Sequence, residues 1–151
     1  MLILGVFGGC GQSDDMTATT IRVVDYEGGV NLSRDGNALV LRDNMLLHSG
    51  SFLSTDQTSY VDLNLDDTKI AGLDEQSLAA FNQDGKKLRI DLEKGAVYFY
   101  TTEKLSDDES FDIRTNTMMV GIRGTSGFVT WGALADEKTG RIRLTYGDVI
   151  K

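Results

Sequence analysis

Short runs in which apolar and polar residues alternate are the feature that most restricts the fold of this chain. From Ile21 onward, apolar side chains recur at every second position, as in VDLNL at 61–65, LRIDLE at 88–93 and SFDIR at 110–114. A period of two is typical of β-strands that bury one face in a core and expose the other to water. The alternation therefore predicts an all-β chain.

Turn sequences between these runs indicate how the strands are connected. Clusters of Gly, Asp and Asn occur at 27–29, 34–37, 66–68 and 83–86, followed by a Lys-Thr-Gly turn at 138–140. Strands and turns that repeat every 8 to 12 residues or so are typical of an antiparallel β-sandwich, roll or solenoid-like arrangement, here with about ten to twelve short strands. The 17 glycines and the absence of proline suit such turns.

One segment carries a helix-like composition. Residues 74–81 read DEQSLAAF, with an acidic start and an alanine-rich interior. Such a short segment is marginal as a helix, so a strand or a single turn fits it equally well.

The N-terminus differs from the rest of the chain. Residues 1–9, MLILGVFGG, are uncharged and end on small residues before Cys10, after which the sequence becomes polar. This pattern resembles the end of a lipoprotein-type signal peptide, although a basic region is missing and Phe7 replaces the usual leucine. We expect Cys10 to be the lipid attachment point, residues 10–19 to be a polar tether, and residues 20–151 to be a single β-domain, truncated at its C-terminus. A buried N-terminal strand with an incidental thiol is the alternative.

Charge and rare residues exclude several classes of function. Fifteen Lys and Arg against 23 Asp and Glu give a net charge of −8. This charge would repel a nucleic-acid backbone. One Cys and one His cannot form an internal disulfide or a Cys/His zinc site. No EF-hand loop or Gly-rich phosphate loop is present, so neither a metal nor a cofactor is expected.

No catalytic set is evident in the sequence. His48 is the only histidine, residues 124–127 lack the G-x-S-x-G spacing, and no S-x-x-K occurs. Pairs of acidic residues could serve a glycan hydrolase or bind calcium, but they fall at expected turns, where Asp caps the backbone. These pairs are Asp66-Asp67, Asp74-Glu75 and Asp107-Asp108. We therefore expect no enzyme, with a carboxylate-based glycan hydrolase as the alternative.

Arg123 and three aromatic residues are candidates for ligand contact. Arg123 stands in an apolar run, MMVGIRG, where an unpaired guanidinium would be costly to bury. We expect it to pair across the sheet, and a contact with a protein partner is the alternative. Tyr98, Tyr100 and Trp131 could form an exposed row that stacks on sugars, or they could pack in the core.

Two stretches, residues 47–81 and 88–129, contain an ordered series of strands and turns, and the second includes Val120-Gly121-Ile122-Arg123-Gly124-Thr125. This order is similar to that of the FecR family, and residues 120–125 are the most specific element. A Ser126-Gly127 pair then separates Thr125 from Phe128, where the family often has one residue. With residues 21–40 as an opening hairpin, the resemblance covers about Thr20 to Trp131. It implies that residues 121–125 form a structural motif.

The resemblance implies an extracytoplasmic β-domain for protein contact and signalling. FecR-like proteins pass a signal from an outer-membrane receptor to a sigma factor through a cytoplasmic helical segment and a membrane span. Because neither part is evident here, only the extracellular module is carried over. We expect a non-enzymatic module, attached to a membrane only through a lipid at Cys10, that binds a protein partner or a cell-envelope component. A glycan-binding β-module is the alternative.

Overall fold

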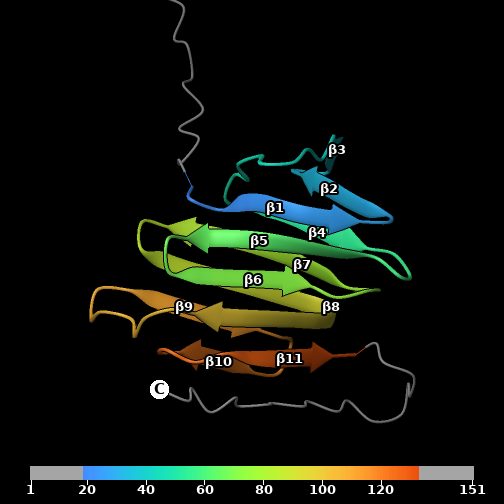
Figure 1. The fold of residues 1–151 in the computed structure, drawn as a ribbon. Coiled ribbons are helices and arrows are strands. Elements are labelled where there is room, and N and C mark those ends of the chain that lie inside the picture. The colour runs from blue at the N-terminus through green and yellow to red at the C-terminus, as the bar shows by residue number, and fades with distance from the viewer. Residues whose placement is uncertain (1–18, 133–151) are drawn as a thin grey trace, which may run out of the picture.

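The computed structural model describes residues 19–132, which form eleven strands and no helix (Figure 1). The strands are β1 Arg22–Glu27, β2 Val30–Arg34, β3 Asn37–Leu39, β4 Ser51–Thr55, β5 Tyr60–Asp66, β6 Lys69–Leu73, β7 Leu78–Asp84, β8 Lys87–Thr101, β9 Ser110–Arg114, β10 Met119–Ile122 and β11 Gly127–Trp131. The prediction of an all-β chain is confirmed. The helix-like segment 74–81 forms a turn and the start of β7.

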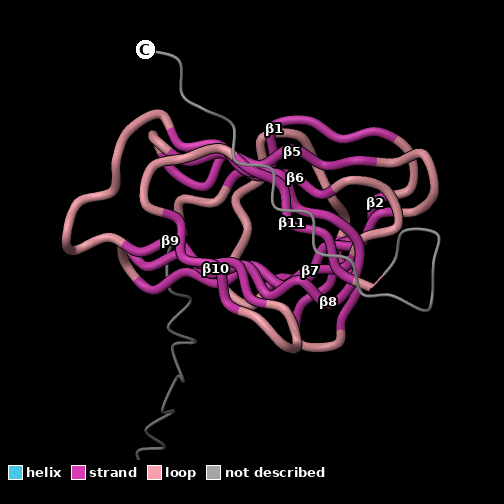
Figure 2. Tube along the Cα trace, turned by 90° about the horizontal axis from the view of Figure 1, so that it is seen from below, coloured by secondary structure: helices cyan, strands magenta, loops and turns pink. Residues whose placement is uncertain are grey.

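The strands form one curled sheet. Their order is β1-β5-β6-β8-β7-β4-β2-β3, with β11 and β9 also paired to β8, and β10 paired to β9. Every pairing is antiparallel except that of β8 with β9. Figure 2 shows β1, β5, β6 and β11 on one side of the interior and β7, β9 and β10 on the other. A sandwich or solenoid arrangement is not confirmed, because a single hydrogen-bonded sheet supplies both sides.

Strand β8 connects the two sides of this sheet. Its first half pairs with β7 and β9, and its second half pairs with β6 and β11. The change occurs at Gly95, whose φ is +92°. A Cβ at Gly95 would lie 2.1 Å from Ser77 Oγ and 2.4 Å from Ser77 Cα. Only glycine fits this junction, because it tolerates positive φ and brings no side chain against the neighbouring backbone.

The core is built from the inward positions of the alternating runs. These side chains are at most 6% exposed, as the period of two predicted. They include Val61, Leu63, Leu65, Leu88, Ile90, Leu92, Val97, Phe99, Phe111 and Ile113. Phe99 and Phe111 meet edge to face, with ring centroids 5.9 Å apart. This contact joins the two halves of the curled sheet across its interior.

Three of the predicted turns join paired strands. They lie between β2 and β3, β5 and β6, and β7 and β8. The turn at residues 27–29 does not, because β1 pairs with β5 while β2 pairs with β3 and β4. Within the predicted opening hairpin at 21–40, β2 and β3 do form a hairpin, but β1 does not pair with β2. The predicted turn at 138–140 lies outside the described residues.

Physical contacts explain why the chain changes sides at residues 27–29. Gly28 has a φ of +80°, and the carbonyl of Gly29 accepts a hydrogen bond from Asp56 N at 2.8 Å. The amide of Gly29 also donates to Ser59 Oγ at 2.9 Å. Contacts to the β4–β5 loop therefore hold this turn, in place of a ladder between its own flanking strands.

Candidate functional site

A row of five residues crosses the outer surface of the sheet on five neighbouring strands. Strand register places Asp25 of β1 opposite Asp62 of β5, Asp62 opposite Gly72 of β6, Gly72 opposite Tyr98 of β8, and Tyr98 opposite Phe128 of β11. We call these five residues the outer row. Because directly opposite residues share one face, the row combines two carboxylates with two aromatic rings on one surface.

Gly72 determines how Tyr98 lies in the outer row. A Cβ at Gly72 would lie 2.1 Å from both Cζ and the hydroxyl oxygen of Tyr98, so the phenol ring occupies the space over this glycine. The ring thus reaches across β6, and its hydroxyl donates a hydrogen bond to the carboxylate of Asp62. Tyr98 is half-buried and Gly72 is buried beneath it. The absence of a side chain at residue 72 therefore permits this orientation of Tyr98.

Two carboxylates stand opposite each other at the β1 end of the row. The hydroxyl of Tyr60 donates to Asp25 Oδ2 at 2.8 Å, just as Tyr98 donates to Asp62. Partial burial raises the pKa of Asp62, and the negative charge of Asp25 raises it further. The hydrogen bond to Asp25 likewise raises the pKa of Tyr60. The two carboxylates repel each other, and together they give this end of the row a negative electrostatic potential.

Exposed apolar side chains flank the outer row. Ile70 of β6 and Tyr100 of β8 are register partners, and they are 41% and 48% exposed. Val24, at the bulge of β1, is 57% exposed. The outer surface of β1, β5, β6 and β8 therefore presents aromatic, aliphatic and acidic groups side by side.

The three aromatic candidates from the sequence do not form a single row. Tyr98 and Tyr100 occupy the outer surface of β8, as the alternation predicted. Trp131 is half-buried and packs against the core cluster instead. It belongs to the inner positions of β11, together with the fully buried Val129. Trp131 therefore cannot join the two tyrosines in a common surface.

Arg123, which we expected to pair across the sheet, is exposed. Its neighbour Ile122 points inward and is 2% exposed, so strand alternation directs Arg123 outward. The guanidinium forms no hydrogen bond or ion pair with any residue between 19 and 132. An exposed guanidinium has no burial cost to offset, so the predicted pairing across the sheet is not needed.

The backbone of the 121–125 segment holds the β8–β9 loop. The carbonyl of Arg123 accepts from Leu105 N at 3.0 Å, and the carbonyl of Thr125 accepts from Thr101 Oγ1 at 3.1 Å. A Cβ at Gly124, whose φ is +143°, would lie 2.9 Å from Lys104 Cα. Gly121 lies in β10 opposite Asp112 and is exposed.

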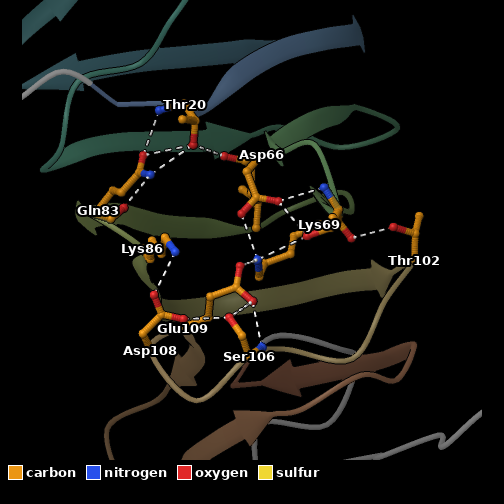
Figure 3. Close-up of polar contacts among 12 residues, drawn as sticks. Thr20, Asp66, Lys69, Gln83, Lys86, Thr102, Ser106, Asp108 and Glu109 are labelled. Carbon is orange, nitrogen blue, oxygen red and sulfur yellow. Dashed lines mark hydrogen bonds and ion pairs between the residues drawn. The ribbon is translucent and has the colours of Figure 1, made fainter.

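A buried lysine lies at one end of the sheet (Figure 3). Lys69 is 1% exposed, and its Nζ donates to Asp66 Oδ2 at 2.8 Å, Glu109 Oε1 at 3.1 Å and Thr68 Oγ1 at 3.2 Å. Burial alone would lower the pKa of Lys69, but hydrogen bonds and charges from Asp66 and Glu109 outweigh it, so that the pKa is raised. A lysine held in its charged form cannot act as a nucleophile or base at neutral pH.

Glu109 anchors the β8–β9 loop to this lysine. Its Oε2 accepts from Ser106 N at 2.8 Å and Ser106 Oγ at 2.9 Å. The bond from the Ser106 backbone, followed by that from Lys69, lowers the pKa of Glu109 to about 2. On the surface beside it, Lys86 lowers the pKa of Asp108 to about 2 through an ion pair of 2.7 Å. These contacts therefore hold the β8–β9 loop against Lys69 and Lys86.

Sequence reasoning missed this buried lysine. The signal was available, because Lys69 shares the inward parity of Ala71 and Leu73 in β6. An inward lysine requires acidic partners. One partner, Asp66, lies in the acidic turn of the sequence, but Glu109 is 40 residues away, and no local pattern indicates it.

The remaining candidates for chemistry do not assemble into a site. Asp66 accepts from Thr68 N at 2.8 Å, and Asp74 accepts from Glu75 N at 2.8 Å, which is the capping role expected of turn carboxylates. Within residues 19–132, no group of three or more His, Cys, Asp or Glu side chains could hold a metal ion. The same residues contain no helix long and apolar enough to cross a membrane. Cys10 lies outside the described residues.

A polar hollow lies on the opposite half of the sheet. It has a volume of about 320 Å³ and is lined by residues that include Ser49, Asn82, Asp84, Lys87 and Asp112. Next to it, Asp91 pairs with Arg89 at 3.1 Å and with Arg114 at 2.7 Å. The charge of Asp91 is therefore compensated within the chain.

Comparison with protein families gives one match. A family model described as FecR protein matches residues 51–149, which is more than half of the chain and includes every strand from β4 to β11. Comparisons with curated proteins and with solved structures gave no match. FecR domains are associated with signalling at the cell envelope, which is consistent with an extracytoplasmic location. The chain belongs to the FecR family.

Proposed function

We propose that this protein is a non-enzymatic FecR module that binds a protein partner outside the cytoplasm during signalling. The observation that carries the proposal is the exposed outer surface around Tyr100 and Ile70. These side chains are 48% and 41% exposed, and they lie on central strands of the sheet rather than on a loop. Contiguous exposed apolar groups rimmed by polar residues mark interaction sites.

The non-enzymatic part of the proposal rests on the chemistry of the charged groups. Of the carboxylates that the sequence singled out, Asp66 and Asp74 cap turns and Asp108 pairs with Lys86. Lys69 is held in its charged form. His48 contributes its backbone carbonyl to a hydrogen bond from Ser51 N at 3.1 Å, and its ring bonds to no described residue. These arrangements supply no nucleophile with an adjacent base.

Site-specific photocrosslinking in cells tests the binding surface. A benzophenone amino acid placed at Tyr100 should form a protease-sensitive adduct, because this position lies in the centre of the proposed surface. The matched control is Val40, which is 70% exposed and lies in the segment after β3. Equal crosslinking at both positions would contradict the proposed surface.

Attachment through Cys10 is a separate part of the proposal. Small residues before this cysteine and a polar segment after it support a lipoprotein. Metabolic labelling with a fatty acid should mark the wild-type protein, and Cys10→Ser should remove the label. Equal labelling of both proteins would refute the anchor.

A glycan-binding module is the second candidate, because Tyr98 and Tyr100 share the outer surface. Stacking of a sugar ring would use the exposed face of Tyr100, so Tyr100→Ala should abolish binding on a glycan array. An adduct from position 100 that a glycosidase removes and a protease does not would favour this candidate over a protein partner. Release of shorter sugars from a bound glycan would instead favour the carboxylate-based hydrolase.

A further inference from the structure

We propose that the outer row binds a segment of the partner that carries arginine or lysine side chains. This inference rests on the proposed function, since it names the chemistry of the partner. It follows from three features of the surface: uncompensated negative charge, aromatic rings beside that charge, and apolar groups that match the stems of long basic side chains.

The negative charge on the outer row is not neutralised within the described chain. Asp25 and Asp62 are direct register partners, and Glu27 follows on the same strand. Asp25 and Asp62 accept hydrogen bonds from the neutral hydroxyls of Tyr60 and Tyr98, and no ion pair engages these two acids or Glu27 among residues 19–132. A phenol satisfies hydrogen-bonding capacity but leaves the charge in place.

On the other half of the sheet, the carboxylate of Asp91 is neutralised by cationic partners within the chain. Asp91 Oδ2 accepts hydrogen bonds from Arg89 Nε at 3.1 Å and Asn82 Nδ2 at 2.9 Å, and Asp91 Oδ1 forms an ion pair with Arg114 Nε at 2.7 Å. A carboxylate on an outer β-surface of this chain can therefore have cationic partners on adjacent strands. The contrast indicates that the cation for Asp25 and Asp62 comes from outside.

The repulsion between the carboxylates of Asp25 and Asp62 favours the binding of a cation between them. The charge of Asp25 contributes to raising the pKa of Asp62, which means that the doubly ionised pair is disfavoured in the unbound protein. A guanidinium or ammonium between the two carboxylates would remove this repulsion. Because Tyr60 and Tyr98 already fix both side chains, little conformational entropy is lost on binding.

Aromatic and aliphatic groups beside the acids select long basic side chains. Tyr98 and the 48% exposed Tyr100 lie on β8, with β6 between them and Asp62 on β5, and the Tyr98 hydroxyl reaches across β6 to the Asp62 carboxylate. Guanidinium groups stack on such rings. Ile70, opposite Tyr100, offers apolar contact for the methylene stem of arginine or lysine. The carboxylates thus match the cationic head group, the rings match the face of a guanidinium, and the aliphatic group matches the methylene stem.

Other occupants fit this surface less well. A second copy of this chain would bring the same acidic row and a net charge of −8 toward it. Nucleic acids and anionic lipid surfaces would be repelled for the same reason. A neutral glycan could stack on Tyr100 but would leave both carboxylates uncompensated.

A charge-neutralised variant tests the proposal without changing the shape of the surface. In the double variant Asp25→Asn with Asp62→Asn, each asparagine carbonyl can still accept the tyrosine hydroxyl. The matched control is Asp84→Asn with Asp107→Asn, which removes the same charge from two exposed residues away from the row. The melting temperature of the first variant should not fall, because it relieves a like-charge pair.

Fluorescence anisotropy with labelled peptides provides the readout. The probes are a peptide of alternating Arg and Ser, a peptide of alternating Glu and Ser with the same length, and a neutral chito-oligosaccharide. The wild type and the control should bind the Arg peptide, and Asp25→Asn with Asp62→Asn should weaken binding about tenfold, as expected for two exposed ion pairs. Binding should also weaken as salt rises to about 0.15 M, where the Debye length is about 8 Å.

Several results would overturn the inference. These are equal affinity for the Arg and Glu peptides, an equal loss in the control variant, or preference for the oligosaccharide. If position 100 crosslinks to a protein but the Arg peptide does not bind, the basic segment is wrong and the proposed function stands. If neither occurs, both are wrong.

Discussion

The junction at Gly95 provides the sharpest test of how this fold is held together. Substituting Gly95→Ala would place a methyl group 2.1 Å from Ser77 Oγ and 2.4 Å from Ser77 Cα. The hydroxyl could rotate away, but the Cα belongs to a backbone that is already bonded, since Ser77 N donates to Thr55 Oγ1 at 3.0 Å. The strand must therefore shift at the point where its pairing changes sides.

The size of the effect follows from two separate costs. A non-glycine residue at positive φ costs about 1–2 kcal/mol. Forcing an extra carbon into a packed site costs typically about 1–3 kcal/mol more. The sum, about 2–5 kcal/mol, should lower the melting temperature by about 8–20 °C, at about 4 °C per kcal/mol for a domain of this size.

A second glycine separates the two costs. Gly85 has a φ of +57°, and a Cβ there would meet no atom within 4 Å. Gly85→Ala should therefore show only the backbone cost and lower the melting temperature by about 4–8 °C. Thermal unfolding followed by circular dichroism measures both variants. If Gly95→Ala loses no more than Gly85→Ala, the close approach to Ser77 does not constrain the junction.

Three further predictions concern charged groups. Lys69→Ala should lower the free energy of unfolding, measured in urea, by about 2–4 kcal/mol, because it leaves Asp66 and Glu109 without their shared cation. A loss below about 0.5 kcal/mol, the level of a typical surface change, would contradict a stabilising role for Lys69. The lowered pKa of Glu109 contributes stability that is complete above the usual pKa of 4.5 and is lost as the pH falls through about 2. The raised pKa of Lys69 contributes stability that is complete below the usual pKa of 10.5 and is lost as the pH rises beyond that value. Melting temperatures across the acid range should therefore decline below pH 4.5 in the wild type and less steeply in Glu109→Gln, and parallel curves would refute this assignment. Arg123→Ala should change the melting temperature by no more than about 2 °C, because the side chain is exposed; a drop of several degrees would show that the guanidinium has a structural partner.

Local alternation was a sound basis for predicting the strands and their faces. Each inward position of the 61–65, 88–93 and 110–114 runs is buried, because side chains of one strand must alternate between its two faces. The same rule would have placed Arg123 outward, beside the inward Ile122. The expectation that Arg123 pairs across the sheet rests on the apolar content of its run and not on this alternation.

Long-range pairing could not be predicted from local patterns. The residues at 27–29 have the composition of a hairpin turn, yet β1 and β2 pair with other strands. Likewise, the outer row depends on register across five strands, and Gly72 gains its role only because Tyr98 lies opposite it. Such relations are set by which strands become neighbours, and the sequence of each strand does not specify its neighbour.

The continuity of β8 has a mechanical consequence. Its second half carries Tyr98 and Tyr100, and its first half carries Arg89 and Asp91. A pull on a partner held at the tyrosines would act along this same backbone, and flanking strands on both sides of each half would carry the load in shear. With no loop between the two halves, the pull would reach the far side of the molecule through a single uninterrupted strand.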